Sequence, residues 1–310
     1  MKGRYLGLGL LALICAALVS CGIWMRQRPA APMAAVQGQV TASLSALPDA
    51  LEKGMLLAAS GNPLIALDSD GSGAVYEVIR NDYRRWPLPE EQQSIPKLIA
   101  PAPDGGYWMV LGETRFVKVS AQGTVLVQQT LEWENAGDMV CDSVGRVYIV
   151  VGNGTEVLRF SPEGVLQGTV DLQADLETVT LTVQKERVFA AYYPLRQKDP
   201  QRVEYAEITE DLRLGKRFCG CVPMGSAKEV YGLGSFLPDY VLMEYNDVGL
   251  YACREEGVWE TVCLWEELYL DGTIRGRMAA DAQGRGAVLY ENNGSAYVLT
   301  LSAAKSKKNP

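Results

Sequence analysis

A short run with alternating aspartates has the residue types that bind a hard cation. Asp68-Ser69-Asp70-Gly71-Ser72-Gly73 places two carboxylates two positions apart ahead of a glycine, as a calcium loop of the EF-hand type begins. That loop also needs a bidentate glutamate at its twelfth position, where this chain has Ile79. Asp and Gly are equally what a hairpin turn requires. The run therefore predicts a turn, and Asp68 and Asp70 stay candidate metal ligands, with calcium as the metal.

The chain contains no histidine. This excludes Ser-His-Asp and Cys-His nucleophilic sites and most catalytic zinc sites. The formal net charge is -8, from 29 basic and 37 acidic residues, which argues against a nucleic-acid partner because phosphate binding needs a basic surface. The sequence favours a binding protein over an enzyme and predicts no cofactor, calcium being the alternative.

The N-terminus has the pattern of an export signal. Lys2 and Arg4 precede Tyr5–Met25, a run of 21 residues without a charge. Leu18-Val19-Ser20-Cys21 resembles the bacterial lipobox, and the resemblance implies that Cys21 is lipidated after signal cleavage.

An uncleaved membrane helix is the alternative for the same segment, because about 20 apolar residues span a bilayer. Trp24 and Arg26 would then lie at the far interface. Under either reading the rest of the chain lies in the bacterial cell envelope, on the outer face of the cytoplasmic membrane and anchored to it.

Five cysteines lie beyond the N-terminal segment, and an odd number leaves at least one thiol unpaired within the domain. Cys219-Gly220-Cys221 is closely spaced for a disulfide and lacks the partners of a four-ligand metal site. Cys253 and Cys263 lie on either side of a turn at Gly257, and the register of that hairpin would not place them opposite each other. We expect most of the thiols to be buried small apolar groups; the five are Cys141, Cys219, Cys221, Cys253 and Cys263.

The elements that would position any site come from a repeat. Its first clear copy is a turn ending at Gly106, strands predicted at Tyr107–Val110 and Arg115–Val119, and a second turn ending at Gly123. A Gly or Asp recurs after each third strand, at spacings of 41, 41, 47 and 46. Four-stranded units at a period of about 40 residues predict a β-propeller. The marker positions are Asp82, Gly123, Gly164, Asp211 and Gly257.

The repeat predicts an all-β chain with six blades. The sixth blade begins near Thr273 and lacks an apolar outer strand after Ala296–Ser302. The β-like segment Val40–Leu47 is predicted to supply that strand and so to close the ring. The predicted domains are a signal peptide or anchor over 1–25, a Pro/Ala-rich tether over 26–38, the propeller over 39–303 and a basic tail over 304–310.

The blade motif, Asp-x-x-Gly before the second strand and Gly after the third, resembles that of bacterial six-bladed propellers of the NHL and YVTN repeat type. The resemblance covers residues 40–303. The fourth repeat departs from it, because Gln184-Lys185-Glu186-Arg187 stands where Asp-x-x-Gly is expected, and this leaves seven blades as the alternative. Such propellers include binding modules, sensor domains and sugar-lactone hydrolases, so the resemblance implies a fold without choosing a function.

Loops between second and third strands lie on one face of a propeller, where ligands usually dock. The longest such loop is Tyr193–Gln201, of mixed charge with two prolines. The candidate ligand-binding residues on this face are Glu113, Asn153, Arg196, Lys198, Asp199, Asn246, Asp247 and Asn292.

The sequence thus predicts an extracytoplasmic, membrane-tethered propeller that acts as a binding, sensing or scaffold module for a protein, peptide or glycan. The alternative is a divalent-metal-dependent hydrolase of sugar lactones or esters. In the hydrolases of this fold, Glu, Asn and Asp from different blades hold the ion, and no fixed spacing marks such a site in this chain.

Overall fold

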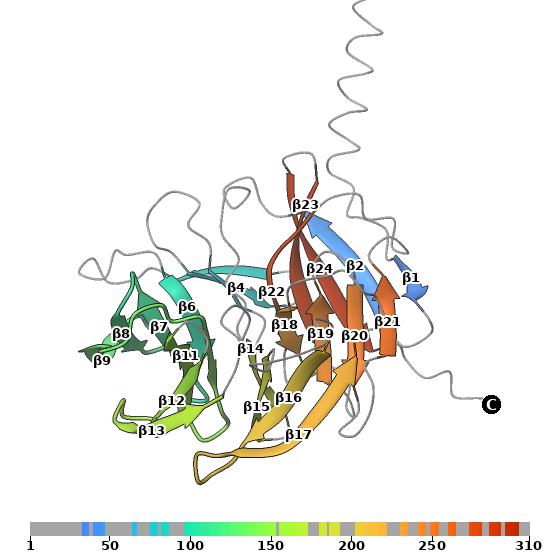
Figure 1. The fold of residues 1–310 in the computed structure, drawn as a ribbon. Helices are drawn as coiled ribbons and strands as arrows, with labels where there is room; N and C mark the ends of the chain where they lie inside the picture. Colours follow the sequence, from blue (N-terminus) through green and yellow to red (C-terminus); the bar gives the residue numbers. More distant parts are fainter. Residues whose placement is uncertain are drawn as a thin grey trace, which may run out of the picture.

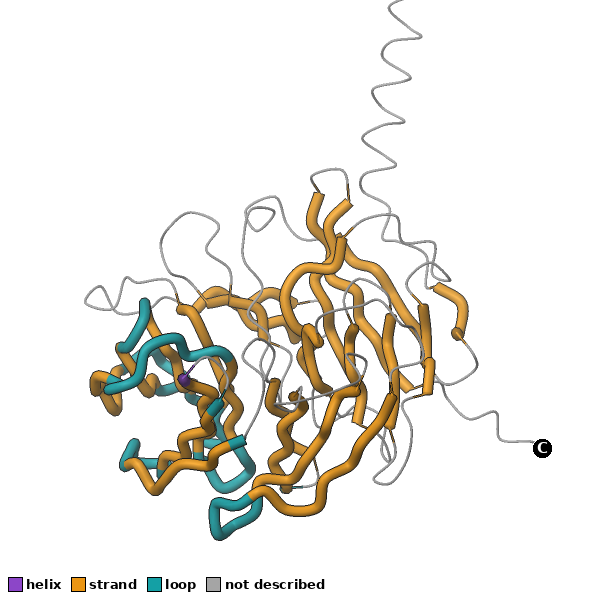
Figure 2. Tube along the Cα trace, viewed as in Figure 1, coloured by secondary structure: helices purple, strands orange, loops and turns teal. Residues whose placement is uncertain are grey.

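The residues described in the computed structural model form mainly β-strands and the turns between them (Figures 1 and 2). The residues that it describes are 33–36, 40–46, 64–66, 75–79, 82–86, 96–152, 155–172, 180–184, 186–192, 202–221, 230–234, 241–245, 249–253, 260–264, 273–280, 285–292 and 295–303. Within these residues the regular structure is almost entirely extended, in agreement with the all-β prediction. The same residues include no helix long and apolar enough to cross a membrane.

The described strands form six sheets, and all neighbouring strands within them are antiparallel. Four sheets have four strands each, in chain order. They are β6 (Pro96–Pro101), β7 (Tyr107–Leu111), β8 (Arg115–Val119) and β9 (Val125–Thr130); β10 (Asp138–Cys141), β11 (Val147–Val151), β12 (Glu156–Phe160) and β13 (Leu166–Asp171); β14 (Thr180–Gln184), β15 (Arg187–Tyr192), β16 (Arg202–Ile208) and β17 (Leu214–Cys221); and β18 (Val230–Gly234), β19 (Val241–Tyr245), β20 (Gly249–Cys253) and β21 (Glu260–Leu264).

The two remaining sheets contain the first and last strands of the described chain. One is β3 (Leu64–Ala66), β4 (Val75–Ile79) and β5 (Asp82–Trp86). The other has the order β1-β2-β24-β23-β22, from β1 (Met33–Val36), β2 (Val40–Ala46), β22 (Thr273–Ala280), β23 (Arg285–Asn292) and β24 (Ser295–Ala303). The strand β1 lies inside the segment predicted as a tether.

From the second repeat on, strand positions follow the predicted repeat. Two of the predicted markers are misplaced: Asp82 is the first residue of β5, opposite Ile79, and does not follow a third strand. Leu212, one residue after Asp211, takes the position of Gly123 and Gly164. The predicted strands at Tyr107–Val110 and Arg115–Val119 are β7 and β8, with Tyr107 opposite Val119. All residues of β7 and β11 are buried, whereas exposure alternates along the outer strand β9. This difference is expected, because a middle strand is covered on both faces and an outer strand on one.

The fourth repeat forms its first hairpin without the Asp-x-x-Gly motif. Gln184 lies opposite Arg187, and Glu186 adopts a φ of 65° in the turn between them. In the two preceding sheets glycine takes the positive φ of the corresponding turn, at Gly105 and Gly145. A tighter turn therefore replaces the motif, and the sheet β14–β17 keeps its four strands.

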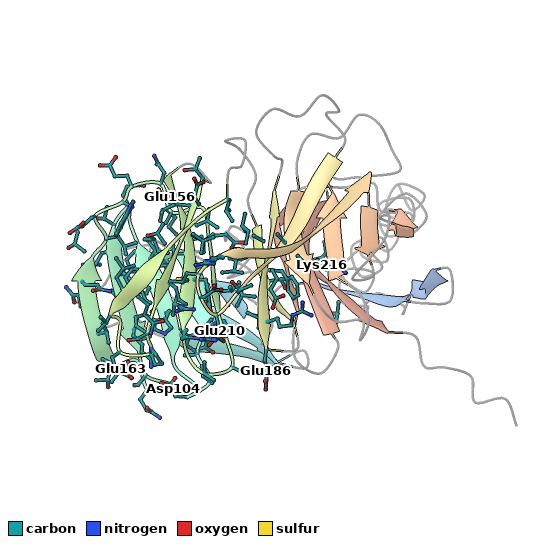
Figure 3. All side chains as sticks on the ribbon, turned by 60° about the horizontal axis from the view of Figure 1, so that its bottom comes forward. Asp104, Glu156, Glu163, Glu186, Glu210 and Lys216 are labelled. Atoms are coloured by element: carbon teal, nitrogen blue, oxygen red, sulfur yellow. The ribbon has the colours of Figure 1, made fainter. Side chains whose placement is uncertain are left out.

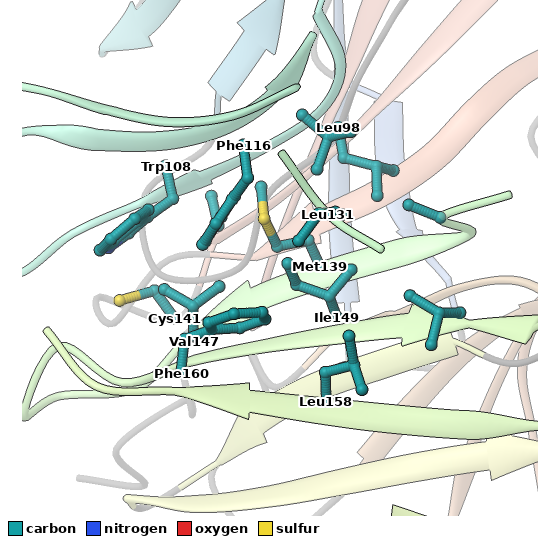
Figure 4. Packing of buried hydrophobic residues seen from close by; sticks show 14 of the residues in the cluster. Leu98, Trp108, Phe116, Leu131, Met139, Cys141, Val147, Ile149, Leu158 and Phe160 are labelled. Carbon is teal, nitrogen blue, oxygen red and sulfur yellow. The ribbon is translucent and has the colours of Figure 1, made fainter. Parts of the chain in front are cut away.

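Consecutive sheets contact each other through their first strands: β6 lies beside β10, β10 beside β14, β14 beside β18, and β18 beside β22. Between the sheets β6–β9 and β10–β13 the core is rich in aromatic residues (Figure 4). Trp108 stacks on Phe116 with ring centroids 4.6 Å apart, and Phe116 contacts Phe160 of the next sheet at 5.0 Å. All three side chains are almost fully buried, so this contact holds the two sheets face to face.

The two ends of the described chain meet in one sheet. Strand β2 lies antiparallel beside β24, with Val40 opposite Ala303 and Ala46 opposite Tyr297 (Figure 1). This is the neighbour that the sequence predicts for the segment Val40–Leu47. Without β2, the backbone edge of β24 would have no partner on that side.

Deletion of residues 39–50 should therefore destabilise the protein strongly. It removes seven cross-strand pairs between β2 and β24, which at roughly 0.2–1 kcal/mol each amounts to about 3 kcal/mol. For a chain of this size that corresponds to a fall in Tm of about 10 °C, measured by circular dichroism. Truncation of residues 304–310, which follow β24, is the control and should leave the melt unchanged. An unaltered melt after the deletion of 39–50 would show that this pairing does not support the fold.

Candidate functional site

Each well-described sheet has two ends of different character (Figure 3). At one end, here called the turn end, short turns join first to second and third to fourth strands. At the opposite end, the loop end, are the connections between second and third strands and those that lead to the next sheet. Figure 3 shows Asp104, Glu163, Glu186 and Glu210 at the turn end and Glu156 at the other. The turn-end segments are 102–106, 120–124, 142–146, 161–165 and 209–213, and the described loop-end residues are 112–114, 131–137, Gly152 and Thr155.

Asp142 organises the turn before β11. Its Oδ1 accepts hydrogen bonds from the backbone amides of Val144 and Arg146, at 3.1 and 2.9 Å. Its Oδ2 accepts a bond from Nε of Arg146 at 2.6 Å. The side chain therefore satisfies backbone donors that the turn leaves open and fixes the arginine beside it. This is the physical role of the motif's aspartate in the turn before β11.

Lys118 joins the sheet β6–β9 to the next one. Its ammonium group lies 2.8 Å from Asp104, donates to the backbone carbonyl of Pro162 at 3.4 Å, and lies 5.4 Å from the ring centroid of Trp108. A second bond joins the same sheets at this turn, since Gln129 donates to the carbonyl of Gly164 at 2.8 Å. The turn between β12 and β13 is thus held against the preceding sheet by charge and by hydrogen bonds.

An ionic contact of the same kind joins the sheets β10–β13 and β14–β17. The guanidinium of Arg146 binds both carboxylate oxygens of Glu210, with Nη2 at 2.8 Å from Oε1. Arg159 donates to the backbone carbonyl of Glu210 at 2.9 Å. Glu210 belongs to the turn between β16 and β17, so the third-to-fourth-strand turn of one sheet again docks on the sheet before it.

These contacts shift the acidity of the groups involved. The hydrogen bond from Arg146 holds the pKa of Glu210 below its ordinary value, and Lys118 does the same for Asp104. Burial raises the pKa of Tyr148, which is almost fully buried in β11. The lowered pKa values favour the charged forms of Glu210 and Asp104, as an ion pair between sheets requires.

Asp138 links the first strands of two sheets near the loop end. Its Oδ2 accepts a hydrogen bond from the backbone amide of Leu181 at 2.7 Å, and its Oδ1 accepts one from Met139 at 2.8 Å. The residue is buried, and Thr182 beside Leu181 is buried as well. A buried carboxylate held by two backbone donors positions β14 against β10.

The loop end presents more freely exposed groups. The carboxylate of Glu113 is 68% exposed and pairs with Lys97 at 2.8 Å. The connection 131–137 is anchored at both ends, because the amide of Leu131 donates to Thr114 and that of Gly137 to Val150. Its middle exposes Glu132, Glu134 and Asn135, while Trp133 packs partly on the core.

The predicted ligand-binding residues are only partly within the described chain. Glu113 lies at the loop end, in the connection between β7 and β8, as expected for that position. Asn292 is the last residue of β23, opposite Ser295, in the corresponding hairpin. The remaining predicted residues lie outside the described residues: Cys21, Asp68, Asp70, Asn153, Arg196, Lys198, Asp199, Asn246 and Asp247. In the part of the chain that is described, no group of three or more His, Cys, Asp or Glu residues could hold a metal ion.

Sequence reasoning did not identify the residues that join the sheets. Lys118 and Arg159 occupy equivalent positions on the third strands of two neighbouring repeats. Arg159 lies three residues before Pro162, and Lys118 lies three residues before Ala121, the residue equivalent to that proline. This shared position is a signal in the sequence from which the two residues could have been found. Asp138 is the first residue of β10, and nothing in its neighbourhood marks it. The partners lie in different repeats, so only the fold brings them together.

Two predictions about the cysteines can be compared with the structure. Cys141 is buried without a disulfide, and burial raises the pKa of its thiol to about 12. Cys263 lies opposite Leu250, and Ala252 opposite Glu260, so Cys253 and Cys263 are out of register as predicted.

Comparison with known proteins supports the fold. No family model matches the chain, and no curated protein has a matching sequence. Among solved structures, YCF48 bound to a D1 peptide has 11% identity and a TM-score of 0.57, with 90% of this chain and 100% of that chain covered. A catalytically inactive virginiamycin B lyase from Staphylococcus aureus, with quinupristin, has 11% identity, a TM-score of 0.56, and coverages of 89% and 96%. A gluconolactonase from Xanthomonas campestris has 13% identity, a TM-score of 0.54, and coverages of 89% and 99%.

These neighbours are β-propeller-like proteins, and at such low identity the likeness concerns the fold alone. The chain is accordingly a nearly all-β protein of propeller-like fold, built from antiparallel sheets that are mostly four-stranded. The neighbours include proteins with binding roles and proteins with enzymatic ones, so the fold does not choose between them.

Replacement of Glu210 tests the ionic contact between sheets. In Glu210→Gln the free energy of unfolding at about pH 7 should fall by at most about 1 kcal/mol, because the carboxylate is 76% exposed. Because the pKa of Glu210 is lower in the folded protein than in the unfolded chain, its charged carboxylate stabilises the fold at pH values above the ordinary pKa. This stabilisation is lost as the pH falls through the pKa of the folded state. Urea titrations of the two proteins should therefore converge as the pH falls through and below the lowered pKa of Glu210. Glu163→Gln, at a turn-end carboxylate bonded within its own turn, is the control. A difference that persists at low pH would contradict the ionic origin.

The thiol of Cys141 should be unreactive in the folded protein. Burial and a pKa of about 12 leave almost no thiolate at about pH 8. Iodoacetamide treatment followed by mass spectrometry of peptides should find Cys141 unmodified in the native protein and modified in urea. Rapid modification of the native protein would show that this sheet interface opens.

Proposed function

We propose that the chain is an extracytoplasmic, membrane-tethered β-propeller whose loop end binds a protein or peptide partner, as a sensing or scaffold module of the cell envelope. Six blades form the ring, and β2 closes it by completing the last blade. Six sheets among the described residues, the lateral contacts between their first strands, and the pairing of β2 with β24 support this arrangement.

The binding role is proposed because charged side chains have different surroundings at the turn end and at the loop end of the sheets. At the turn end, charged groups are engaged between sheets, as in the contacts of Lys118 with Pro162 and of Arg146 with Glu210. At the loop end, the connections are anchored by backbone bonds, and the side chains of Glu132 and Glu134 are left exposed. A scaffold whose sheets are joined by polar contacts at one end, and whose loops are exposed at the other, is suited to binding a partner.

Two of the structural neighbours bear on the choice of function. YCF48 is a propeller-like protein bound to a peptide, which supports a peptide or protein as the class of partner. The inactive virginiamycin B lyase carries a replacement of histidine by alanine. Because this chain has no histidine, it cannot use the same group, and the lyase activity is not proposed for it.

The tether is proposed from the N-terminal sequence. The uncharged run Tyr5–Met25 follows two basic residues, and Cys21 completes a lipobox-like sequence. Lipidation of Cys21, or a retained helix over the same residues, would hold the propeller at the outer face of the cytoplasmic membrane.

A hydrolase of sugar lactones or esters is the second candidate. It rests on the likeness in fold to the gluconolactonase and on the aspartates Asp68 and Asp70, for which a calcium ion is the proposed ligand. Hydrolysis of a lactone by the purified chain, abolished by a chelator, would replace the binding role by this one.

Photo-crosslinking from the two ends tests the binding role. A photoreactive amino acid at Glu113, at the loop end, should crosslink a partner in native membranes, and the same group at Glu163, at the turn end, should not. The two positions are exposed glutamates on neighbouring sheets, so they are matched in chemistry. Deletion of residues 193–201 should reduce the crosslink from Glu113. Equal crosslinking from both positions, or none from either, would refute a partner at the loop end.

A further inference from the structure

The last sheet has a fifth strand at its outer edge. In the four sheets of four strands the outermost strand is the fourth, whereas in the last sheet β1 lies beyond β2 (Figure 1). Met33 of β1 is opposite Ala42, and Val36 is opposite Val40. The strand β1 therefore covers only the first three residues of β2. Along residues 43–46, here called the open edge, no described strand lies on the outer side of β2.

The sequence before β1 is unsuited to covering the open edge. If the pairing of β1 with β2 continued toward the N-terminus, Pro32 and Pro29 would lie opposite residues of the open edge. Alternate residues of an antiparallel strand point their amide groups toward the same neighbour. Because Pro29 and Pro32 are three positions apart, one of them would have to donate a hydrogen bond to β2, and proline has no N–H group.

The open edge also lacks the features that protect the other outer strands. The strands β9, β13, β17 and β21 each pair with the third strand of their sheet through a shift in register. Such shifts distort an edge and hinder the addition of another strand. Strand β2 instead pairs with β24 at seven consecutive positions without a shift. Charged residues protect edges as well, and the chain has none between Arg28 and Asp49.

A second copy of the chain matches this edge. Two identical edges can pair antiparallel about a two-fold axis, which makes the contact self-complementary. The chain as a whole has a net charge of -8, but residues 29–48 contribute nothing to it. Pairing through the open edge therefore brings no like charges into contact at the strands themselves.

The position of β1 determines the register of this pairing. Residues opposite each other in an antiparallel pair point their backbone groups the same way, so a symmetric pairing is centred on a residue. A pairing centred on Leu44 would place residue 46 of the second copy opposite Ala42, where Met33 already lies. A pairing centred on Ser45 avoids this conflict. It places Ser45 opposite its own counterpart and Leu44 opposite residue 46.

We propose that the open edge of β2 pairs with the same edge of a second copy, centred on Ser45, so that the last sheets of two chains form one continuous sheet. One short strand from each copy is a small contact beside the roughly 1,200–2,000 Å² that stable interfaces bury, so the dimer is weak and forms where chains are concentrated. The dimer goes beyond the proposed binding at the loop end. Its test detects only contact between copies, so either proposal can fail without the other.

Disulfide crosslinking of the full-length chain in native membranes tests the dimer. In Ser45→Cys the two new thiols lie on directly opposite residues, whose Cα atoms are about 4.5–5.5 Å apart, within the range that a disulfide needs. In Leu44→Cys, the matched control, the thiols lie on diagonal neighbours about 7–8 Å apart. After mild oxidation, Ser45→Cys should give at least about 10-fold more crosslinked dimer than Leu44→Cys on a non-reducing gel. Mass spectrometry should find the peptide joined to its own copy through position 45.

A charge at the same position provides a second test that needs no disulfide. Ser45→Lys places two like charges opposite each other and should abolish energy transfer between fluorescently labelled full-length chains at high density in phospholipid vesicles. Thr41→Lys, on the part of β2 that β1 covers, is the matched control and should leave the transfer unchanged. Circular dichroism should show that both variants are folded.

Three results would overturn the proposal. Equal crosslinking of Ser45→Cys and Leu44→Cys, or none in either, would show that the edges do not meet in this register. A crosslink from Ser45→Cys to a different protein would show that the edge receives a foreign strand. Unchanged energy transfer in Ser45→Lys would show that any contact between copies lies elsewhere.

Discussion

The docking of a third-to-fourth-strand turn on the preceding sheet is the directional contact that orients neighbouring sheets at two of the described interfaces. It occurs between β6–β9 and β10–β13, where Lys118 donates to Pro162, and between β10–β13 and β14–β17, where Arg146 and Arg159 bind Glu210. The partners differ, yet in both cases a cationic side chain reaches across to a turn. Hydrophobic packing between sheets is non-directional, and these polar contacts fix how far one sheet is rotated against the next.

The same turn explains why the repeat tolerates departures from its motif. Gly123 and Gly164 have φ values of 82° and 86°, and Leu212 takes the equivalent place with a φ of 58°. A side chain there costs roughly 1–2 kcal/mol. Leu212 offsets this by packing over Gly168, where an added Cβ would lie 2.5 Å from its Cδ1 atom. The turn between β16 and β17 thus has a leucine in place of the glycine. Gly168, on the sheet against which this turn packs, leaves the room that the leucine needs.

Local features of the fold could be predicted from the sequence, and contacts between repeats could not. Strands such as β7 and β11 follow from apolar runs bounded by turn residues, and the place of Val40–Leu47 beside β24 follows from a missing outer strand. The contact of Arg146 with Glu210 joins residues of different sheets, and each residue alone resembles any exposed charge. Of the candidate site, the sequence could place Glu113 in its loop but could not find Asp138, because its role depends on an amide donor in another repeat.

The difference between the two ends of the sheets also explains why the proposed partner cannot be predicted from the sequence. Turn-end residues are constrained by geometry, so they recur with recognisable spacing and reveal the fold. Loop-end residues carry no such geometric constraint, and a loop that recognises a surface needs no fixed spacing.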